Sequence, residues 1–123
     1  MILQSELHRV YPRPHERALK KLPTTLDVPG APKVIHVPGH SPGSAVLHLA
    51  GHDAAFVGDA IATLDVLSGA TGPRIAAFTA DRAQAMSSLT RLEGIDAAIV
   101  LPGHGQPWSG GLSAAVAAAR AAG

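Results

Sequence analysis

Residues 38–44 read PGHSPGS, and this short stretch is the most informative part of the chain. It follows residues 33–37, which have the composition of a strand, so His40 lies in a Gly/Pro turn directly after that strand. Asp59 and His104 also sit beside glycine, each just after a short apolar run. In β-sheet proteins, rigid strands commonly aim such loop residues at a shared site. We therefore predict that His40, Asp59 and His104 lie together at one edge of a sheet.

The residue types at these three turns favour metal binding. Imidazole and carboxylate are the ligands that Zn²⁺ takes when no thiolate is available, and Mn²⁺ or Fe²⁺ accept them as well. A carboxylate such as Asp59 can also bridge two metals that activate a shared water. Glycines beside each ligand permit tight turns and close backbone approach, at Gly39, Gly43, Gly58 and Gly103.

Apolar runs between turn signals define the expected strands. They lie at residues 33–37, 45–50, 54–57 and 97–101. The second and third of these are three residues apart, which favours a hairpin. Residues 60–78 remain ambiguous, and Gly69, Gly72 and Pro73 indicate that part of this stretch is a loop.

Two helices are expected in the second half of the chain. Thr79 or Asp81 can cap a helix that runs to Glu93, where Gly94 ends it. Its apolar face would consist of Ala83, Met86, Leu89 and Leu92. Ser109 can cap a final Ala-rich helix over residues 112–122. This order of elements predicts an α+β fold, with a mixed β-sheet and helices on one face.

The three turns together resemble the C-terminal half of the metallo-β-lactamase superfamily, a family of α/β/β/α sandwich hydrolases that includes glyoxalase II-like thioesterases. Residues 37–44 resemble the loop that carries a histidine of the first metal site. Residues 56–59 resemble the strand whose aspartate bridges both metals, and residues 101–105 resemble the loop whose histidine binds the second metal. The resemblance implies metal ligands at His40, Asp59 and His104, with Asp59 catalytic. It implies supporting loop roles for Ser41, Ser44 and Gly58, and one or two zinc ions as cofactor.

One motif of that family is missing from the sequence. His-x-His-x-Asp-His should precede His40, yet no two histidines in the chain are two residues apart. We therefore expect a half-domain over residues 24–123, preceded by an irregular or loosely helical segment over residues 1–23. The resemblance implies a hydrolase of small esters, thioesters, lactams or phosphoesters that is inactive as an isolated, truncated chain. The substrate-binding residues remain unknown at this point.

Two alternatives concern function. The first is a non-catalytic remnant that self-associates through an uncovered sheet face, either as a homo-oligomer or with a complementing half. The second is a module that binds an anionic partner through the basic stretch Arg9–Lys21, although prolines and Glu16 make a solvated segment the simpler interpretation.

A serine-hydrolase interpretation also has to be weighed, because residues 39–43 read GHSPG, a literal Gly-x-Ser-x-Gly. Two observations exclude it. The oxyanion hole needs the backbone N–H of the residue after Ser41, and Pro42 has none. The elbow must also open a helix, whereas residues 45–50 are expected to be a strand.

Composition limits the remaining classes. The chain has 123 residues with ten basic and nine acidic side chains, so nothing favours nucleic acid or an anionic membrane as partner. Without cysteine, disulfides and thiolate metal sites are excluded. The N-terminus lacks the pattern of a signal peptide, and no apolar run reaches the ~20 residues that a membrane span needs. We therefore expect a cytoplasmic protein.

Overall fold

The computed structural model of the protein describes residues 24–123. Residues 1–23, with the predicted irregular segment and the basic stretch Arg9–Lys21, lie outside the described residues. No helix in the described part of the chain is long and apolar enough to cross a membrane.

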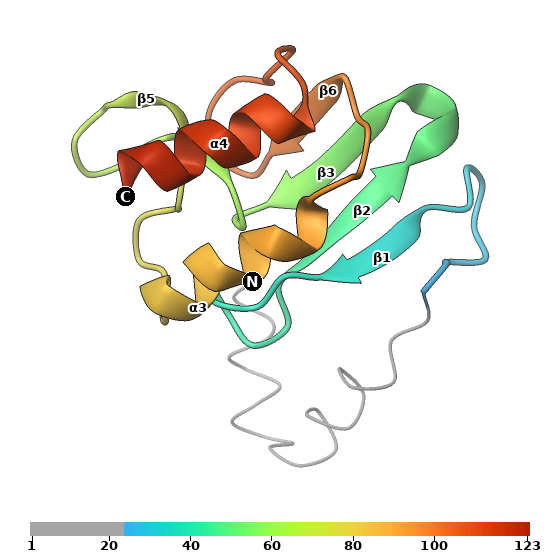
Figure 1. The fold of residues 1–123 in the computed structure, drawn as a ribbon, viewed down its shortest axis with the longest axis horizontal. Helices are drawn as coiled ribbons and strands as arrows, with labels where there is room; N and C mark the ends of the chain where they lie inside the picture. Colours follow the sequence, from blue (N-terminus) through green and yellow to red (C-terminus); the bar gives the residue numbers. More distant parts are fainter. Residues whose placement is uncertain (1–23) are drawn as a thin grey trace.

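A four-stranded mixed sheet forms the centre of the fold (Figure 1). Its strands are β1 (Lys33–His36), β2 (Ala45–Leu49), β3 (Ala54–Gly58) and β6 (Ile99–Pro102), in the order β1-β2-β3-β6. Strand β2 pairs antiparallel with both β1 and β3, and β6 pairs parallel with β3. The predicted hairpin of β2 and β3 is thereby confirmed. It turns through a short 3₁₀ helix, η1 (Ala50–His52), and a left-handed Asp53.

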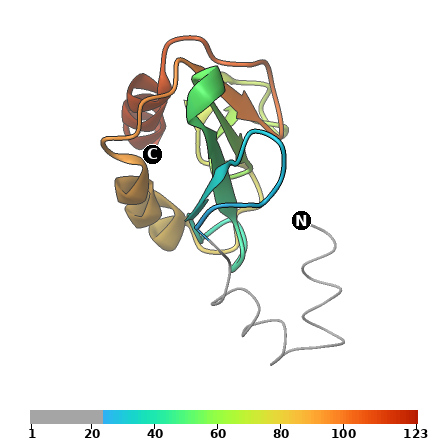
Figure 2. The same ribbon diagram turned by 90° about the vertical axis from the view of Figure 1, so that its right-hand side faces the viewer.

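Both α-helices of the described chain lie on the same face of this sheet (Figure 2). They are α3 (Arg82–Ser88), which continues as the 3₁₀ helix η2 (Leu89–Leu92), and α4 (Leu112–Ala122). The prediction of an α+β fold with a mixed sheet and helices on one face is confirmed. The core lies between sheet and helices, where the largest buried side chains include Val46, Val57, Val100, Leu89, Leu92 and Leu112.

Two expectations about the helices and one about the last strand were wrong. Ala83 is exposed, because the short helix α3 turns Ala85 and Ser88 toward the core instead. Ser109 does not cap α4, whose N-cap is Gly111. The last strand begins at Ile99 rather than Ala97, and it ends one residue later than predicted.

The backbone groups of Ala97 and Ala98 form hydrogen bonds outside the sheet, which explains the late start of β6. Ala98 N–H donates to the Asp53 carboxylate, while the two carbonyls accept from Leu112 and Gly111 at the start of α4. These two residues therefore anchor a helix and a turn instead of extending the strand.

The ambiguous stretch 60–78 contains a second, two-stranded sheet. Its strands are β4 (Ala62–Leu64) and β5 (Thr71–Arg74), so Gly72 and Pro73 lie in a strand and not in a loop. Proline lacks a backbone donor and is tolerated only at the edge of a sheet, as in this two-stranded pair. The hairpin places β5 beside α4 (Figure 1).

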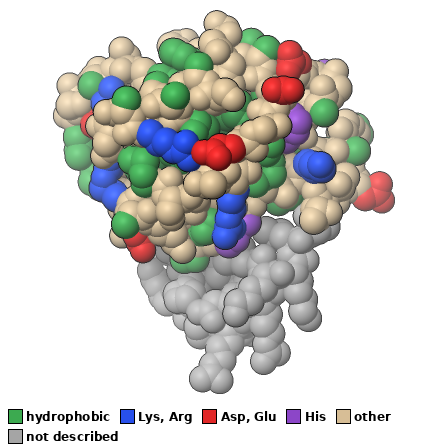
Figure 3. All heavy atoms as spheres, in the orientation of Figure 1, with side chains coloured by type: hydrophobic (Ala, Val, Ile, Leu, Met, Phe, Trp, Pro, Cys, Tyr) green, Lys and Arg blue, Asp and Glu red, His purple; other side chains and the backbone are tan. Residues whose placement is uncertain are grey.

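The sheet face opposite the helices is apolar. Cross-strand neighbours Val34, Leu47, Phe56 and Leu101 form one row across all four strands. They alternate with the buried residues of the helix-covered face, so they point to the other side. Phe56 is 45% exposed and Ile99 is 36% exposed. On the helix side, acidic and basic side chains are interspersed rather than gathered in one patch (Figure 3).

Candidate metal centre

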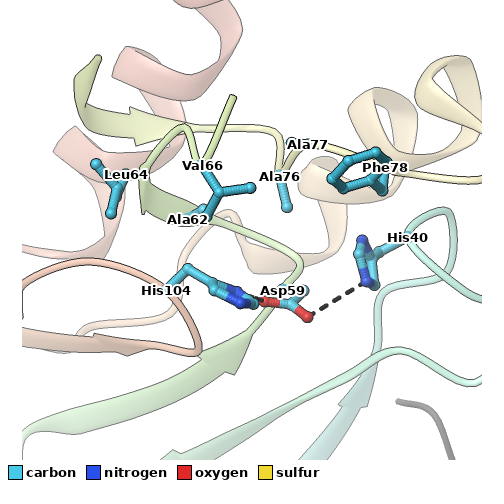
Figure 4. A pocket seen from close by; sticks show the side chains of 9 residues that line it. All are labelled: His40, Asp59, Ala62, Leu64, Val66, Ala76, Ala77, Phe78 and His104. Carbon is cyan, nitrogen blue, oxygen red and sulfur yellow. Dashed lines mark hydrogen bonds and ion pairs between the residues drawn. The ribbon is translucent and has the colours of Figure 1, made fainter. Parts of the chain in front are cut away.

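The three predicted ligands meet at one edge of the main sheet (Figure 4). Because β1, β3 and β6 run in the same direction, their C-terminal ends share that edge, and His40, Asp59 and His104 follow those ends. His40 Nε2 lies 3.3 Å from Asp59 Oδ2, and His104 Nδ1 lies 2.7 Å from Asp59 Oδ1. The two imidazoles thus lie against different oxygens of one carboxylate.

Asp59 is held at the bottom of the site, with its side chain 10% exposed. The neighbouring loop is tied down by the backbone bond from Gly103 N–H to the Gly58 carbonyl, at 2.8 Å. A Cβ atom on Gly103 would lie 2.8 Å from Asp59 Oδ1. Glycine at 103 is therefore required for the carboxylate to keep its place beside the His104 loop. Gly58 itself adopts a positive φ of 54°.

The loop that carries His40 packs directly against helix α3. Gly39 has a φ of 140°, and a Cβ atom there would lie 2.3 Å from the Ala85 backbone. Two backbone bonds fasten the loop to the start of the helix, from Ala80 N–H to the His40 carbonyl and from Asp81 N–H to the Gly39 carbonyl. The Asp81 side chain caps α3 by accepting from Gln84 N–H, as one of the two predicted caps.

Thr79 orients the His40 ring. The Thr79 hydroxyl donates to the Ala76 carbonyl at 2.6 Å, and its oxygen lies 3.3 Å from His40 Nδ1. Because the hydroxyl proton is already used, Thr79 accepts from Nδ1–H. In the neutral ring, Nε2 then presents a lone pair toward Asp59 Oδ2. Two acceptors facing each other at 3.3 Å need a proton or a metal cation between them.

His104 is the exposed member of the group, at 53%. Its loop is fixed to β4, because Thr63 N–H donates to the His104 carbonyl and the Thr63 hydroxyl donates to the Gln106 carbonyl. Trp108 follows in the same loop. Its indole N–H donates to the Gly111 carbonyl at 3.0 Å, so it anchors the start of α4.

Ser41 and Ser44 shape the His40 loop. Their hydroxyls lie 3.2 Å apart, and Ser44 N–H donates to the Ser41 carbonyl. Ser44 is buried, and its carbonyl accepts from Val37 N–H. The following residues form strand β2, so the Gly-x-Ser-x-Gly sequence does not open a helix and the serine-hydrolase alternative is excluded.

The remaining histidines of the described chain have structural roles or lie at the surface. His36 Nε2 donates to the Pro42 carbonyl, and His48 Nε2 donates to the Asp96 carbonyl. His52 is exposed in η1. The spacing of four residues between His36 and His40, and between His48 and His52, therefore does not reflect chelation.

A cleft of about 300 Å³ opens at the His–Asp–His group (Figure 4). One wall carries the three polar side chains. The other wall is apolar and is formed by Ala62, Leu64, Val66, Ala76, Ala77 and Phe78. Sequence reasoning missed this wall and the role of Thr79, because both depend on how the stretch 60–81 folds back over the sheet edge.

The donor chemistry suits a divalent metal, but the three groups do not form a complete cage. Within residues 24–123, no set of three or more His, Cys, Asp or Glu side chains is arranged to hold a metal ion as it stands. The reason is visible in the geometry, since each imidazole nitrogen faces its own oxygen of Asp59. Additional ligands from outside this group are needed to complete a site.

Comparisons with known proteins identify the same family that the turns resemble. The family model of the metallo-beta-lactamase superfamily matches residues 2–104. The metallo-beta-lactamase family protein TTHA1429 from Thermus thermophilus is 24% identical with a TM-score of 0.58, over 80% of this chain and 32% of that one. TTHA1623, solved in a di-iron-bound form, is 27% identical to this chain, with a TM-score of 0.53. The match covers 80% of this chain and 46% of the TTHA1623 chain.

This chain therefore spans less than half the length of either structure. No curated protein matches the sequence.

Proposed function

Because this chain belongs to the metallo-β-lactamase superfamily, we propose that it carries part of the metal centre of a metal-dependent hydrolase. In this proposal His40 contributes to one metal, His104 contributes to a second, and Asp59 bridges them. The substrate is a small molecule with an ester, thioester, lactam or phosphoester bond. A metal bound there would lower the pKa of a water molecule and so supply a nucleophile at neutral pH.

The observation that carries the proposal is the use of both Asp59 oxygens. A carboxylate can bridge two cations by offering one oxygen to each, and here each oxygen already faces a different imidazole nitrogen, at 3.3 Å and 2.7 Å. Thr79 supports this role by holding the His40 proton on Nδ1, which leaves Nε2 free for a cation. Zinc, manganese and iron all fit this donor set, and iron is the metal found in TTHA1623.

The remaining ligands must come from elsewhere, since the described group is incomplete and the sequence has no His-x-His. We propose that a second polypeptide or a longer form of the protein supplies them. With only part of a site, the chain is expected to bind metal weakly and to hydrolyse no substrate at a full rate.

Titration with Zn²⁺, followed by elemental analysis, tests the metal site. We expect weak binding to the wild type and at least a tenfold loss of affinity in the variants His40→Ala and Asp59→Asn. His52→Ala is the matched control, because it removes an exposed histidine outside the site. Equal metal uptake by all four proteins would contradict the assignment. If the chain alone hydrolysed a substrate at a full rate, the proposal that its metal centre is incomplete would be wrong.

A second candidate function is self-association, and the apolar sheet face favours it. The row Val34, Leu47, Phe56 and Leu101 crosses all four strands on the side that neither α3 nor α4 covers (Figure 2). A second copy of the chain, packed sheet on sheet, would bury this row against its own copy of the same row. Light scattering at micromolar concentration should show a dimer, and a strict monomer would argue against it.

A further inference from the structure

Phe78 is held in an unusual position at the mouth of the cleft. Its backbone adopts a φ of 60°, and its side chain is 76% exposed. A left-handed conformation is costly for an aromatic residue, and exposure of the ring to water recovers none of that cost. Strained residues of this kind cluster at active sites, ligand-binding segments and switch regions.

The segment around Phe78 is fastened on both sides. On one side the Thr79 hydroxyl donates to the Ala76 carbonyl. On the other, Ala80 N–H donates to the His40 carbonyl and Asp81 N–H donates to that of Gly39. The same contacts that position His40 therefore fix Phe78 beside it, which ties the aromatic ring to the site.

Phe78 completes the apolar wall that faces the polar one. In Figure 4 its ring lies across from the His40 ring, and Val66 lies across from His104 and Asp59. Val66 is also 49% exposed. The cleft thus has one side that suits a reacting polar bond and one side that suits a hydrocarbon group. Its volume of about 300 Å³ is at the lower end of the range for small-molecule sites.

We propose that this wall is a subsite for an apolar acyl group, so that the substrate is an ester or thioester of a short hydrocarbon acid. The inference rests on the proposed hydrolase function and narrows its substrate class. No lysine or arginine is among the described residues that line the cleft. This wall therefore has no cationic side chain to pair with a charged acyl group.

The test measures binding of neutral ligands without metal, so it does not depend on a complete metal centre. Methyl butanoate, methyl pentanoate and methyl hexanoate are titrated into the metal-free chain, and the methyl signals of Ala62, Val66 and Ala77 are followed by NMR. We expect these signals to shift and the affinity to rise up to about fourfold per added methylene, which corresponds to about 0.8 kcal/mol.

Variants of Phe78 separate a binding role from a structural one. Phe78→Ala should weaken methyl hexanoate binding several-fold, and Phe78→Leu should retain most of it. Phe78→Gly should lose binding while the protein becomes no less stable, because glycine accepts the positive φ without strain. Leu67→Ala is the control, since Leu67 is 71% exposed but does not line the cleft.

Two results would overturn the subsite. One is an affinity that does not change with the length of the ester's acyl chain. The other is a set of shifts that map to Phe56 and its neighbours on the apolar sheet face. If the esters bind as expected but Zn²⁺ binding does not depend on His40 or Asp59, the metal assignment fails while the apolar subsite stands. If metal binds as proposed and the esters do not, only the subsite fails.

Discussion

At the scale of single residues, the orientation of His40 depends on one hydroxyl. In Thr79→Val the acceptor for Nδ1–H is lost, and the ring is free to place its proton on either nitrogen. We expect about a tenfold to hundredfold loss of Zn²⁺ affinity, the usual effect of removing a partner of a ligating histidine. Zinc titration measures the effect, and ¹⁵N NMR of the imidazole reports the tautomer.

Thr79→Ser is the matched control for that variant. It keeps the hydroxyl and should bind zinc nearly as well as the wild type. If Thr79→Val and Thr79→Ser bound equally, the hydroxyl would have no part in orienting His40.

Gly39 is the residue on which the placement of the His40 loop depends. In Gly39→Ala the new methyl group would lie 2.3 Å from the Ala85 Cα and N atoms, which are backbone atoms of a helix and cannot move aside alone. We expect a loss of about 1–3 kcal/mol in the free energy of unfolding, as is typical of overpacking. Urea denaturation measures it. Gly51→Ala, where a Cβ would meet nothing within 4 Å, should change stability little.

The residues of the site were predictable to different degrees. The sequence alone was enough to find His40, Asp59 and His104. Each follows an apolar run and stands beside glycine, and this pattern is visible in the local sequence. Thr79 and Phe78 could not be found in this way, because nothing near them in the sequence shows that their segment folds back onto the His40 loop. Thr79 and Asp81 were the two predicted alternatives for the helix cap, and Asp81 takes that role.

At the scale of elements, the turn of the β4–β5 hairpin depends on an ionised carboxylate. Leu67 N–H donates to Asp65 Oδ1 at 2.9 Å, and this bond, with a weaker one from Ser68 N–H, lowers the pKa of Asp65 below its ordinary value of 3.8. Because folding lowers this pKa, the ionised carboxylate stabilises the folded turn at pH values above 3.8. This contribution is lost as the pH falls through the folded pKa.

The expected result is a Leu67 amide signal that titrates with a midpoint below pH 3.8. A pH series of ¹H–¹⁵N spectra measures the midpoint. In Asp65→Asn this titration should disappear, whereas Asp27→Asn should leave it unchanged. A midpoint above the ordinary value would show that the carboxylate does not accept these bonds in solution.

The elements themselves were predicted best where the hydrophobic pattern was strong. The two strands of the hairpin and the final helix are close to their predicted bounds, since each is a mostly apolar or Ala-rich run. Strand β5 was missed because Gly72 and Pro73 disfavour strands in general, and only its position in a two-stranded sheet permits them. The face of α3 was misjudged because the helix shortens into a 3₁₀ turn at Leu89, which changes the side-chain period.

At the scale of the whole molecule, the apolar sheet face opposite α3 and α4 should control association. Phe56 lies in the middle of the apolar row and is 45% exposed. In Phe56→Thr a residue that suits strands replaces the exposed aromatic ring, so we expect the fold to persist and the dimer to weaken at least tenfold. Sedimentation equilibrium measures the dissociation constant.

Leu67→Thr provides the comparison for that experiment. It removes a still more exposed apolar side chain, but from the β4–β5 turn rather than from the sheet face. If both variants weakened the dimer equally, the contact would not be specific to the apolar sheet face.

The pairing of β6 with β3 has a consequence for the order in which the molecule is assembled. Asp59 and His104 are 45 residues apart and come together only when this parallel pair has formed. Because contacts between distant segments form more slowly than local hairpins, this pairing should be among the last folding events. A metal ion held by both side chains would therefore select chains that have finished folding, and a newly synthesised protein would acquire it only after its last strand is in place.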